Sequence, residues 1–97
     1  RIQLAHGDAR DWVPPFTPHT VVTNPPYGER LEHDPEQLAQ TWRALGHFLH
    51  AHCRGATAFV LSGNPETSRH LGLRAEQKFP VRNGPIDCRW LRYTIDR

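Results

Sequence analysis

The chain has 97 residues, the size of one small domain, and 37% of them are hydrophobic, which is compatible with a modest core. No apolar run is long enough to span a membrane, and no charged start leads into the apolar core of a signal peptide. The net charge of +2 is only mildly basic and two cysteines are too few for a disulfide framework, so we expect a cytoplasmic protein with reduced thiols and no membrane partner.

The basic residues are almost all arginine, since Lys78 is the single lysine among the 12. Arginine suits contacts with phosphates and base edges, so this composition is compatible with a nucleic-acid partner. A general preference for arginine would give the same composition, and both interpretations stay open at this point.

The first predicted elements are two short strands separated by a proline-rich loop. Residues 2–5 have the pattern of a strand already under way at the first residue, and the chain holds no methionine, so we expect a piece of a longer protein. Residues 11–18 contain prolines that exclude regular structure. Residues 20–23 are too apolar for an exposed edge, and we expect them to form a central strand of a parallel sheet.

A helix is predicted over residues 35–53. Asp34 is a suitable N-cap, Pro35 suits the first helical position, and Gln37 lies three residues past the cap. The pair Arg54-Gly55 is typical of a helix end. One apolar stripe repeats every three or four residues along this segment: Leu38, Trp42, Leu45, Leu49 and Cys53.

Residues 56–61 predict a third, buried strand. A short helix is expected over residues 65–71, with Gly72 at its end. Before it, Ser62-Gly63-Asn64 could hold an anion or provide a simple N-cap, and we favour the N-cap.

The chain closes with a predicted hairpin. Residues 76–81 and 86–95 flank Asn83-Gly84, the strongest short hairpin signal in the sequence. Apolar positions change parity along the second strand, so it is either buried on both faces or bulged near Trp90-Leu91. Strands that alternate with helices predict an α/β fold with a parallel sheet, here ending in an antiparallel hairpin and with no internal domain boundary.

The stretch Asn24-Pro25-Pro26-Tyr27 ends the second strand abruptly, because proline has no backbone N–H and restricts the residue before it. In an open α/β sheet, ligands bind beyond the carboxyl ends of the strands. The side-chain oxygen of Asn24 and the carbonyl of Pro25 can both accept hydrogen bonds, and Tyr27 offers a flat face for stacking. These features suit the exocyclic amine of a nucleobase, although two prolines could also merely end a strand.

A reaction follows from this geometry. Two acceptors that hold the hydrogens of an exocyclic amine favour a more tetrahedral nitrogen, with its lone pair directed outward. An electrophilic methyl group on that line would be attacked directly, so catalysis would rest on positioning and electrostatics. The target base must be unpaired or flipped out of a helix to reach the site.

The motif TNPPYGERL, residues 23–31, resembles the catalytic loop of class I S-adenosylmethionine-dependent methyltransferases that modify exocyclic amines. The stretch VRNGPIDCRWLRYTI, residues 81–95, is similar to the closing hairpin of the bacterial large-subunit ribosomal RNA guanine-N2 methyltransferases, and HGDARD, residues 6–11, resembles a turn near the cofactor adenine. The resemblance covers nearly the whole chain and implies a partial Rossmann-like class I methyltransferase sheet, S-adenosylmethionine as cofactor and RNA, expected to be ribosomal RNA, as substrate.

The resemblance also implies roles for single residues. The residues implied for catalysis are Asn24, Pro25, Pro26 and Tyr27. Those implied to bind the cofactor are Asp8, Ala9 and Asn24. Those implied to bind the RNA are Tyr27, Gly28, Glu29 and Arg30. A solvated polar loop explains Glu29 and Arg30 about as well.

The chain departs from the family pattern because the glycine-rich cofactor loop is absent. We therefore expect residues 1–97 to be the C-terminal half of a catalytic domain that is inactive alone, with strands four, five, seven and six of the family fold side by side. The missing N-terminal half, and in some members a THUMP RNA-binding domain, would be its partners. Adenine-N6 methylation and a noncatalytic RNA-binding module remain the alternatives.

The end of the predicted helix carries a dense set of metal-ligand types: His47, His50, His52 and Cys53. Zinc sites usually draw their ligands from spaced pairs, and residue 52 points away from 47 and 50 on a helix. We therefore expect exposed histidines on a helix face, and no metal.

Overall fold

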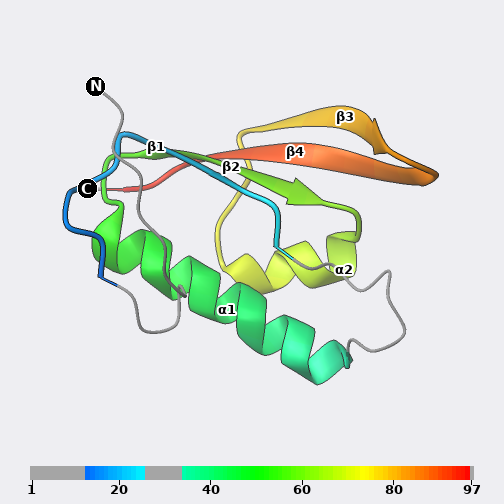
Figure 1. The fold of residues 1–97 in the computed structure, drawn as a ribbon, viewed down its shortest axis with the longest axis horizontal. Helices are drawn as coiled ribbons and strands as arrows, with labels where there is room; N and C mark the ends of the chain where they lie inside the picture. The colour runs from blue at the N-terminus through cyan, green and yellow to red at the C-terminus, as the bar shows by residue number, and fades with distance from the viewer. Residues whose placement is uncertain (1–12, 26–33, 97) are drawn as a thin grey trace.

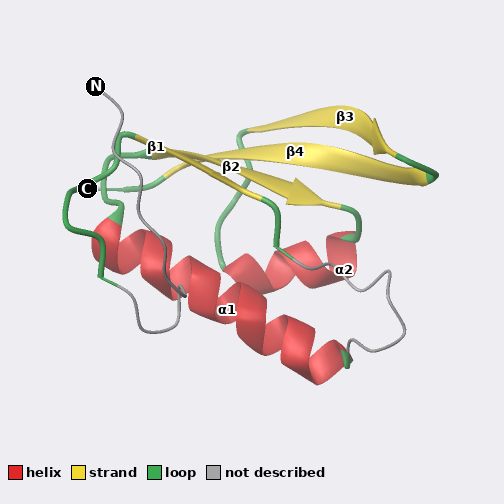
Figure 2. Ribbon diagram, in the orientation of Figure 1, coloured by secondary structure: helices red, strands yellow, loops and turns green. Residues whose placement is uncertain are grey.

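The computed structural model describes residues 13–25 and 34–96, and these form a sheet with helices on one face (Figure 1). The predicted strand at residues 2–5 lies outside the described residues. Colouring by secondary structure separates the two layers (Figure 2). In chain order the elements are β1 (Thr20–Thr23), α1 (Pro35–His52), β2 (Thr57–Ser62), α2 (Pro65–Ser68), the 3-10 turn η1 (Arg69–Leu71), β3 (Gln77–Asn83) and β4 (Ile86–Thr94).

The four described strands lie in the order β1-β2-β4-β3. Strands β1 and β2 are parallel, whereas β4 is antiparallel to both of its neighbours, β2 and β3. This order is the one expected from the resemblance, in which strands four, five, seven and six of the family fold lie side by side. The expectation of a central strand at residues 20–23 is wrong for the described sheet: β1 is its edge, and Val22 is 65% exposed.

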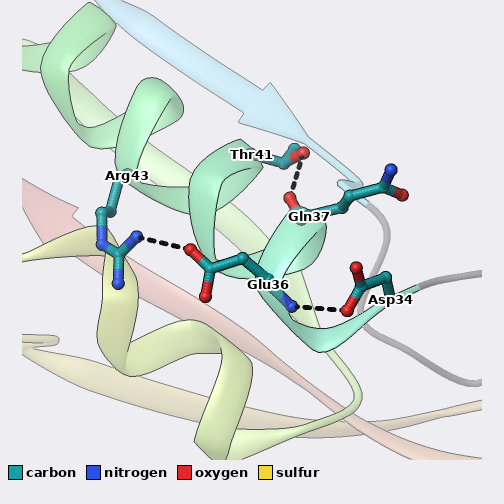
Figure 3. Close-up of polar contacts among 5 residues, drawn as sticks. All are labelled: Asp34, Glu36, Gln37, Thr41 and Arg43. Carbon is teal, nitrogen blue, oxygen red and sulfur yellow. Dashed lines mark hydrogen bonds and ion pairs between the residues drawn. The ribbon is translucent and has the colours of Figure 1, made fainter.

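Helix α1 begins as the sequence predicts. The Asp34 side chain accepts a hydrogen bond from the Glu36 backbone N–H at 3.0 Å, and Pro35 occupies the first helical turn (Figure 3). Further along, the Thr41 hydroxyl donates to the Gln37 carbonyl at 2.9 Å, and Arg43 lies 3.9 Å from the Glu36 carboxylate. The whole predicted stripe is buried, with no member more than 8% exposed: Leu38, Trp42, Leu45, Leu49 and Cys53.

The core lies between these helices and one face of the sheet. Side chains alternate between the two faces of a strand, so Ala58 and Val60 of β2 share a face with their partners Tyr93 and Leu91 of β4. All four are at most 6% exposed. This is the face that α1 and α2 cover.

The two helical segments meet at a point of very close approach. Gly46 of α1 lies against the backbone of Leu71 in η1, so close that a side-chain carbon at residue 46 would collide with the Leu71 carbonyl oxygen. The turn then ends at Gly72, which adopts a left-handed conformation with φ of 76°. The predicted short helix at residues 65–71 is therefore present, with its second half tightened to 3-10 geometry.

The hairpin turn differs from its prediction by one residue. Asn83 pairs with Ile86, so the two loop residues are Gly84 and Pro85 rather than Asn83 and Gly84. Gly84 has φ of 64°, and proline at the second loop position excludes the type I′ turn, which leaves type II′. The pairing of β4 with β2 and with β3 is unbroken, so the prediction of a bulge near Trp90-Leu91 is wrong. The alternative prediction, a strand with apolar side chains on both faces, holds.

The other face of the sheet carries several exposed apolar side chains and no described helix (Figure 2). We call it the open face and define it by Val22, Phe59, Phe79, Val81 and Trp90, which the strand registers place on the same side. Val22, Phe79 and Val81 are 65%, 42% and 37% exposed, and Phe59 and Trp90 are half-buried. A surface of this kind marks a site that another segment or molecule covers.

Candidate functional site

The candidate site begins where β1 ends. Thr23 pairs with Val60 of β2 as the last pair of the parallel register, and Asn24 and Pro25 follow it directly in the chain. Asn24 is exposed, whereas Pro25 is buried. The two parallel strands thus end at one edge of the sheet, which is where open α/β sheets bind their ligands.

Two groups at the start of this loop can accept hydrogen bonds, the side-chain oxygen of Asn24 and the carbonyl of Pro25. No described residue forms a hydrogen bond with the Asn24 side chain or with the Pro25 carbonyl. Burial of the Pro25 ring fixes the chain direction, because proline also restricts the backbone of Asn24 before it. Two acceptors are therefore held near each other at the end of a strand.

The neighbouring strand ends in a turn whose polar groups are already used. The Ser62 hydroxyl donates to the Asn64 carbonyl at 3.1 Å and accepts from the Asn64 N–H at 3.3 Å. The Asn64 side chain accepts from the Glu66 N–H at 3.0 Å, so Asn64 is the N-cap of α2. The prediction of a simple cap at this turn is confirmed, and Asn64-Pro65 differs from Asn24-Pro25 in having its side-chain oxygen occupied.

Most of the residues named from the sequence lie outside the described part of the chain. The structure places two of the predicted site residues, Asn24 and Pro25. The others are outside the described residues: Asp8, Ala9, Pro26, Tyr27, Gly28, Glu29 and Arg30.

At the histidine-rich end of α1, the described side chains do not gather into a set of metal ligands. Cys53 is fully buried, and burial raises the pKa of its thiol, which disfavours the thiolate that a metal would need. His47 is exposed, and the His52 ring packs against Phe48 at a centroid distance of 5.4 Å. Within residues 13–25 and 34–96, no three His, Cys, Asp or Glu side chains come together to hold an ion.

Sequence reasoning missed a groove between α2 and the hairpin, with a volume of about 930 Å³. We call it the basic groove and define it by its five cationic lining residues: Arg69, Arg74, Lys78, Arg82 and Arg89. A signal was present in the sequence, because Lys78 and Arg82 share the parity that places them on one face of a strand. The folding of η1 and its following loop toward the same groove could not be deduced from that pattern.

No helix in the described part of the chain has the length and apolar character that crossing a membrane requires.

The sequence matches a family model over residues 1–92, that of UPF0020, described as an RMKL-like methyltransferase domain. Similar curated proteins include the ribosomal RNA large subunit methyltransferases K/L of Syntrophotalea carbinolica, 43% identical over 75 residues, and of Methylococcus capsulatus, 40% identical over 95 residues. The alignments cover 77% and 98% of this chain but only 10% and 13% of these relatives. The chain thus spans a small part of the relatives it matches.

Two crystal structures are similar in fold. A possible methylase from Clostridium difficile 630 has a TM-score of 0.78 at 25% identity, with 94% of this chain and 24% of that chain covered. SMU.472 complexed with SAH has a TM-score of 0.77 at 22% identity, with 91% and 23% covered. The chain therefore has the mixed α/β sheet of class I methyltransferase structures, as the sequence resemblance implied.

Proposed function

The chain belongs to the UPF0020 family of RMKL-like methyltransferase domains, and from that premise we propose that it methylates RNA as part of a longer enzyme. The cofactor is S-adenosylmethionine, and the acceptor is the exocyclic N2 amine of a guanine in ribosomal RNA. The observation that carries this proposal is a pair of acceptors at the carboxyl end of β1, the Asn24 side chain and the Pro25 carbonyl, which form no hydrogen bond with any described residue.

The two acceptors suit an amine that must be made nucleophilic. An unactivated exocyclic amine conjugates its lone pair into the base, and hydrogen bonds from its two N–H groups to Asn24 Oδ1 and the Pro25 carbonyl oxygen oppose that conjugation. The lone pair then points away from the two oxygens. When bound, S-adenosylmethionine supplies the electrophilic methyl group. The work of Asn24 and Pro25 is positioning and electrostatic stabilisation, with no covalent bond to the protein.

The remaining roles follow the family motif. Pro26 shapes the turn and Tyr27 stacks on the extruded base, while Gly28, Glu29 and Arg30 help to place the RNA. Asp8 and Ala9 would contact the adenine of the cofactor, and Asn24 would contact both the cofactor and the base. The free, exposed amide of Asn24 fits this double contact, because it offers an acceptor and donors that no described residue uses.

The open face supports a second part of the proposal, that residues 1–97 are the C-terminal half of the catalytic domain. Exposed apolar side chains on the second face of a sheet, such as Val22 and Phe79, suit cover by a second layer, as parallel sheets of α/β proteins generally have. The other half of the same domain supplies that layer and the glycine-rich cofactor loop. Residues 1–97 alone are therefore inactive.

The test is methyl transfer by the intact natural protein. It is incubated with labelled S-adenosylmethionine and unmodified ribosomal RNA, and the RNA is then digested to nucleosides. Label in N2-methylguanosine supports the proposal. Label in methyladenosine keeps the mechanism and replaces the substrate, whereas RNA binding with no label in any nucleoside favours a noncatalytic RNA-binding module.

The role of Asn24 is tested by Asn24→Ala. Loss of one preorganised hydrogen-bonding group should lower kcat on the order of a hundredfold or more. His47→Ala changes an exposed side chain of α1 and serves as the control, with kcat unchanged. Equal rates for the two variants would contradict the assignment of Asn24.

A further inference from the structure

The basic groove concentrates more positive charge than the chain as a whole. Its lining carries five cationic side chains and one carboxylate, that of Asp87, which gives +4, whereas the complete sequence carries +2. The remainder of the chain is therefore net negative. A groove with one sign of charge attracts and concentrates a ligand of the opposite sign.

Three of the five cations have no ion-pair partner among residues 13–25 and 34–96. Arg82 is paired with Asp87 at 3.4 Å across the hairpin, and Arg69 is paired with Glu66 at 3.5 Å. The other three cations are exposed and form no ion pair with any described residue: Arg74, Lys78 and Arg89. No carboxylate in the described part of the chain neutralises them, so they are the groove charges best suited to an external anion.

The positions of these side chains converge on the groove from separate elements. Lys78 of β3 pairs with Leu91, and Arg89 of β4 pairs with Pro80, so both side chains lie on the face that carries the helices. Arg74 comes from the segment between η1 and β3. Edge strands often carry charges that oppose aggregation, which explains Lys78 on β3 but neither Arg74 nor Arg89.

The groove also begins next to the candidate site. Its lining includes Ser62, the last residue of β2, and the neighbouring parallel strand β1 ends two residues before Pro25. The far wall, β3, lies three strands from β1 in the sheet, which is a lateral distance of roughly 14 Å at the usual strand spacing. A few nucleotides of single strand span that distance.

We propose that the basic groove holds the phosphate backbone of the RNA segment beside the target base, through Arg74, Lys78 and Arg89. This inference rests on the proposed function for the identity of the ligand, since that function brings RNA to the adjacent loop. The three side chains are positioning residues: they hold the strand that presents the base and do not touch the reacting amine. Single-stranded RNA binds in such grooves through backbone charge, with little dependence on sequence.

The test compares two double variants that remove the same charge. Arg74→Gln/Arg89→Gln removes two groove cations, and Arg43→Gln/Arg54→Gln removes two exposed arginines that do not line the groove. Binding of a short fluorescein-labelled single-stranded RNA to the intact protein is followed by anisotropy across a salt series. The groove variant should bind on the order of tenfold more weakly at physiological salt, and its log–log salt slope should fall by about 1.4. The control should change little in either measure.

Each outcome separates this inference from the proposed function. A raised KM for RNA with unchanged kcat in the groove variant supports the groove, because only the placement of the strand is lost. Equal affinities and salt slopes for the two double variants overturn it, even if the wild-type protein forms N2-methylguanosine. RNA binding that depends on the groove, without any methylation, would instead support the role of the groove and contradict the proposed function.

Discussion

Replacing Gly46 by alanine should destabilise the protein, although alanine is the better helix former. Gly46 is buried in the middle of α1, where the helix touches η1. A Cβ at this position would collide with the carbonyl oxygen of Leu71 and lie 3.1 Å from its carbonyl carbon. Because these atoms belong to the backbone, no side-chain rotation relieves the overlap, and α1 and η1 must move apart.

The magnitude follows from two opposing contributions. In a helix interior, alanine is favoured over glycine by about 1 kcal/mol. Forcing an extra carbon into a packed contact costs about 1–3 kcal/mol. Separation of α1 from η1 also loosens Leu71, which is 3% exposed and belongs to the same core as Leu49. We therefore expect a net loss of up to about 2 kcal/mol in the free energy of unfolding.

The assay is urea unfolding of the intact protein, together with hydrogen exchange at the amides of α1. Ala51→Gly, at an exposed position of the same helix, measures the contribution of helix propensity alone and should cost about 1 kcal/mol. The reasoning would be refuted if Gly46→Ala stabilised the protein by a similar amount, because the contact with Leu71 would then impose no constraint.

Two further predictions concern the core and the open face. Burial raises the pKa of Tyr93 from 10.0 to about 12. The folded state therefore loses about 2–3 kcal/mol of stability as pH rises from 10 to 12, and loses nothing below pH 10. Tyr93→Phe should flatten that part of the plot of unfolding free energy against pH, and an unchanged slope would contradict the assignment. Val22→Asp in the intact protein should cost about 3 kcal/mol or more in thermal unfolding, because a covered open face would bury the charge unpaired. Val13→Asp, with a starting exposure of 67% against 65% for Val22, should stay within about 0.5 kcal/mol, and equal melting of the two variants would argue that the open face stays in water.

The sequence was sufficient for the elements whose signals are local. Asp34 and Pro35 set the start of α1, and the spacing of its apolar stripe predicted which side chains are buried. Gly72 and Gly84 marked the ends of η1 and β3 because each adopts a positive φ. The hairpin turn was placed one residue early, since an Asn-Gly pair is the stronger signal and the proline at residue 85 shifts the loop.

Features that depend on neighbours in space were harder to predict. The apolar run of β1 indicated a central strand. Hydrophobicity shows that a strand prefers a buried environment, but it does not show which segment covers the strand. The change of parity in β4 allowed a bulge, and the unbroken registers with β2 and β3 decided against it. The contact of Gly46 with Leu71 has no signature in sequence, because it joins a helix to the backbone of a later turn.

The sheet order explains why the candidate site and the basic groove can serve one substrate. Strand β2 lies between β1 and β4, so the loop after β1 and the groove wall on β4 are separated by a single strand, although they are far apart in the chain. The turn after β2 uses its own polar groups internally, through Ser62 and Asn64. In the proposed function, recognition then falls to two flanking regions: the uncharged acceptors after β1, which suit an amine, and the cations of the basic groove, which suit phosphates. The target base offers an uncharged amine, and the RNA backbone beside it carries charged phosphates. We therefore assign the base to the loop after β1 and the backbone to the basic groove.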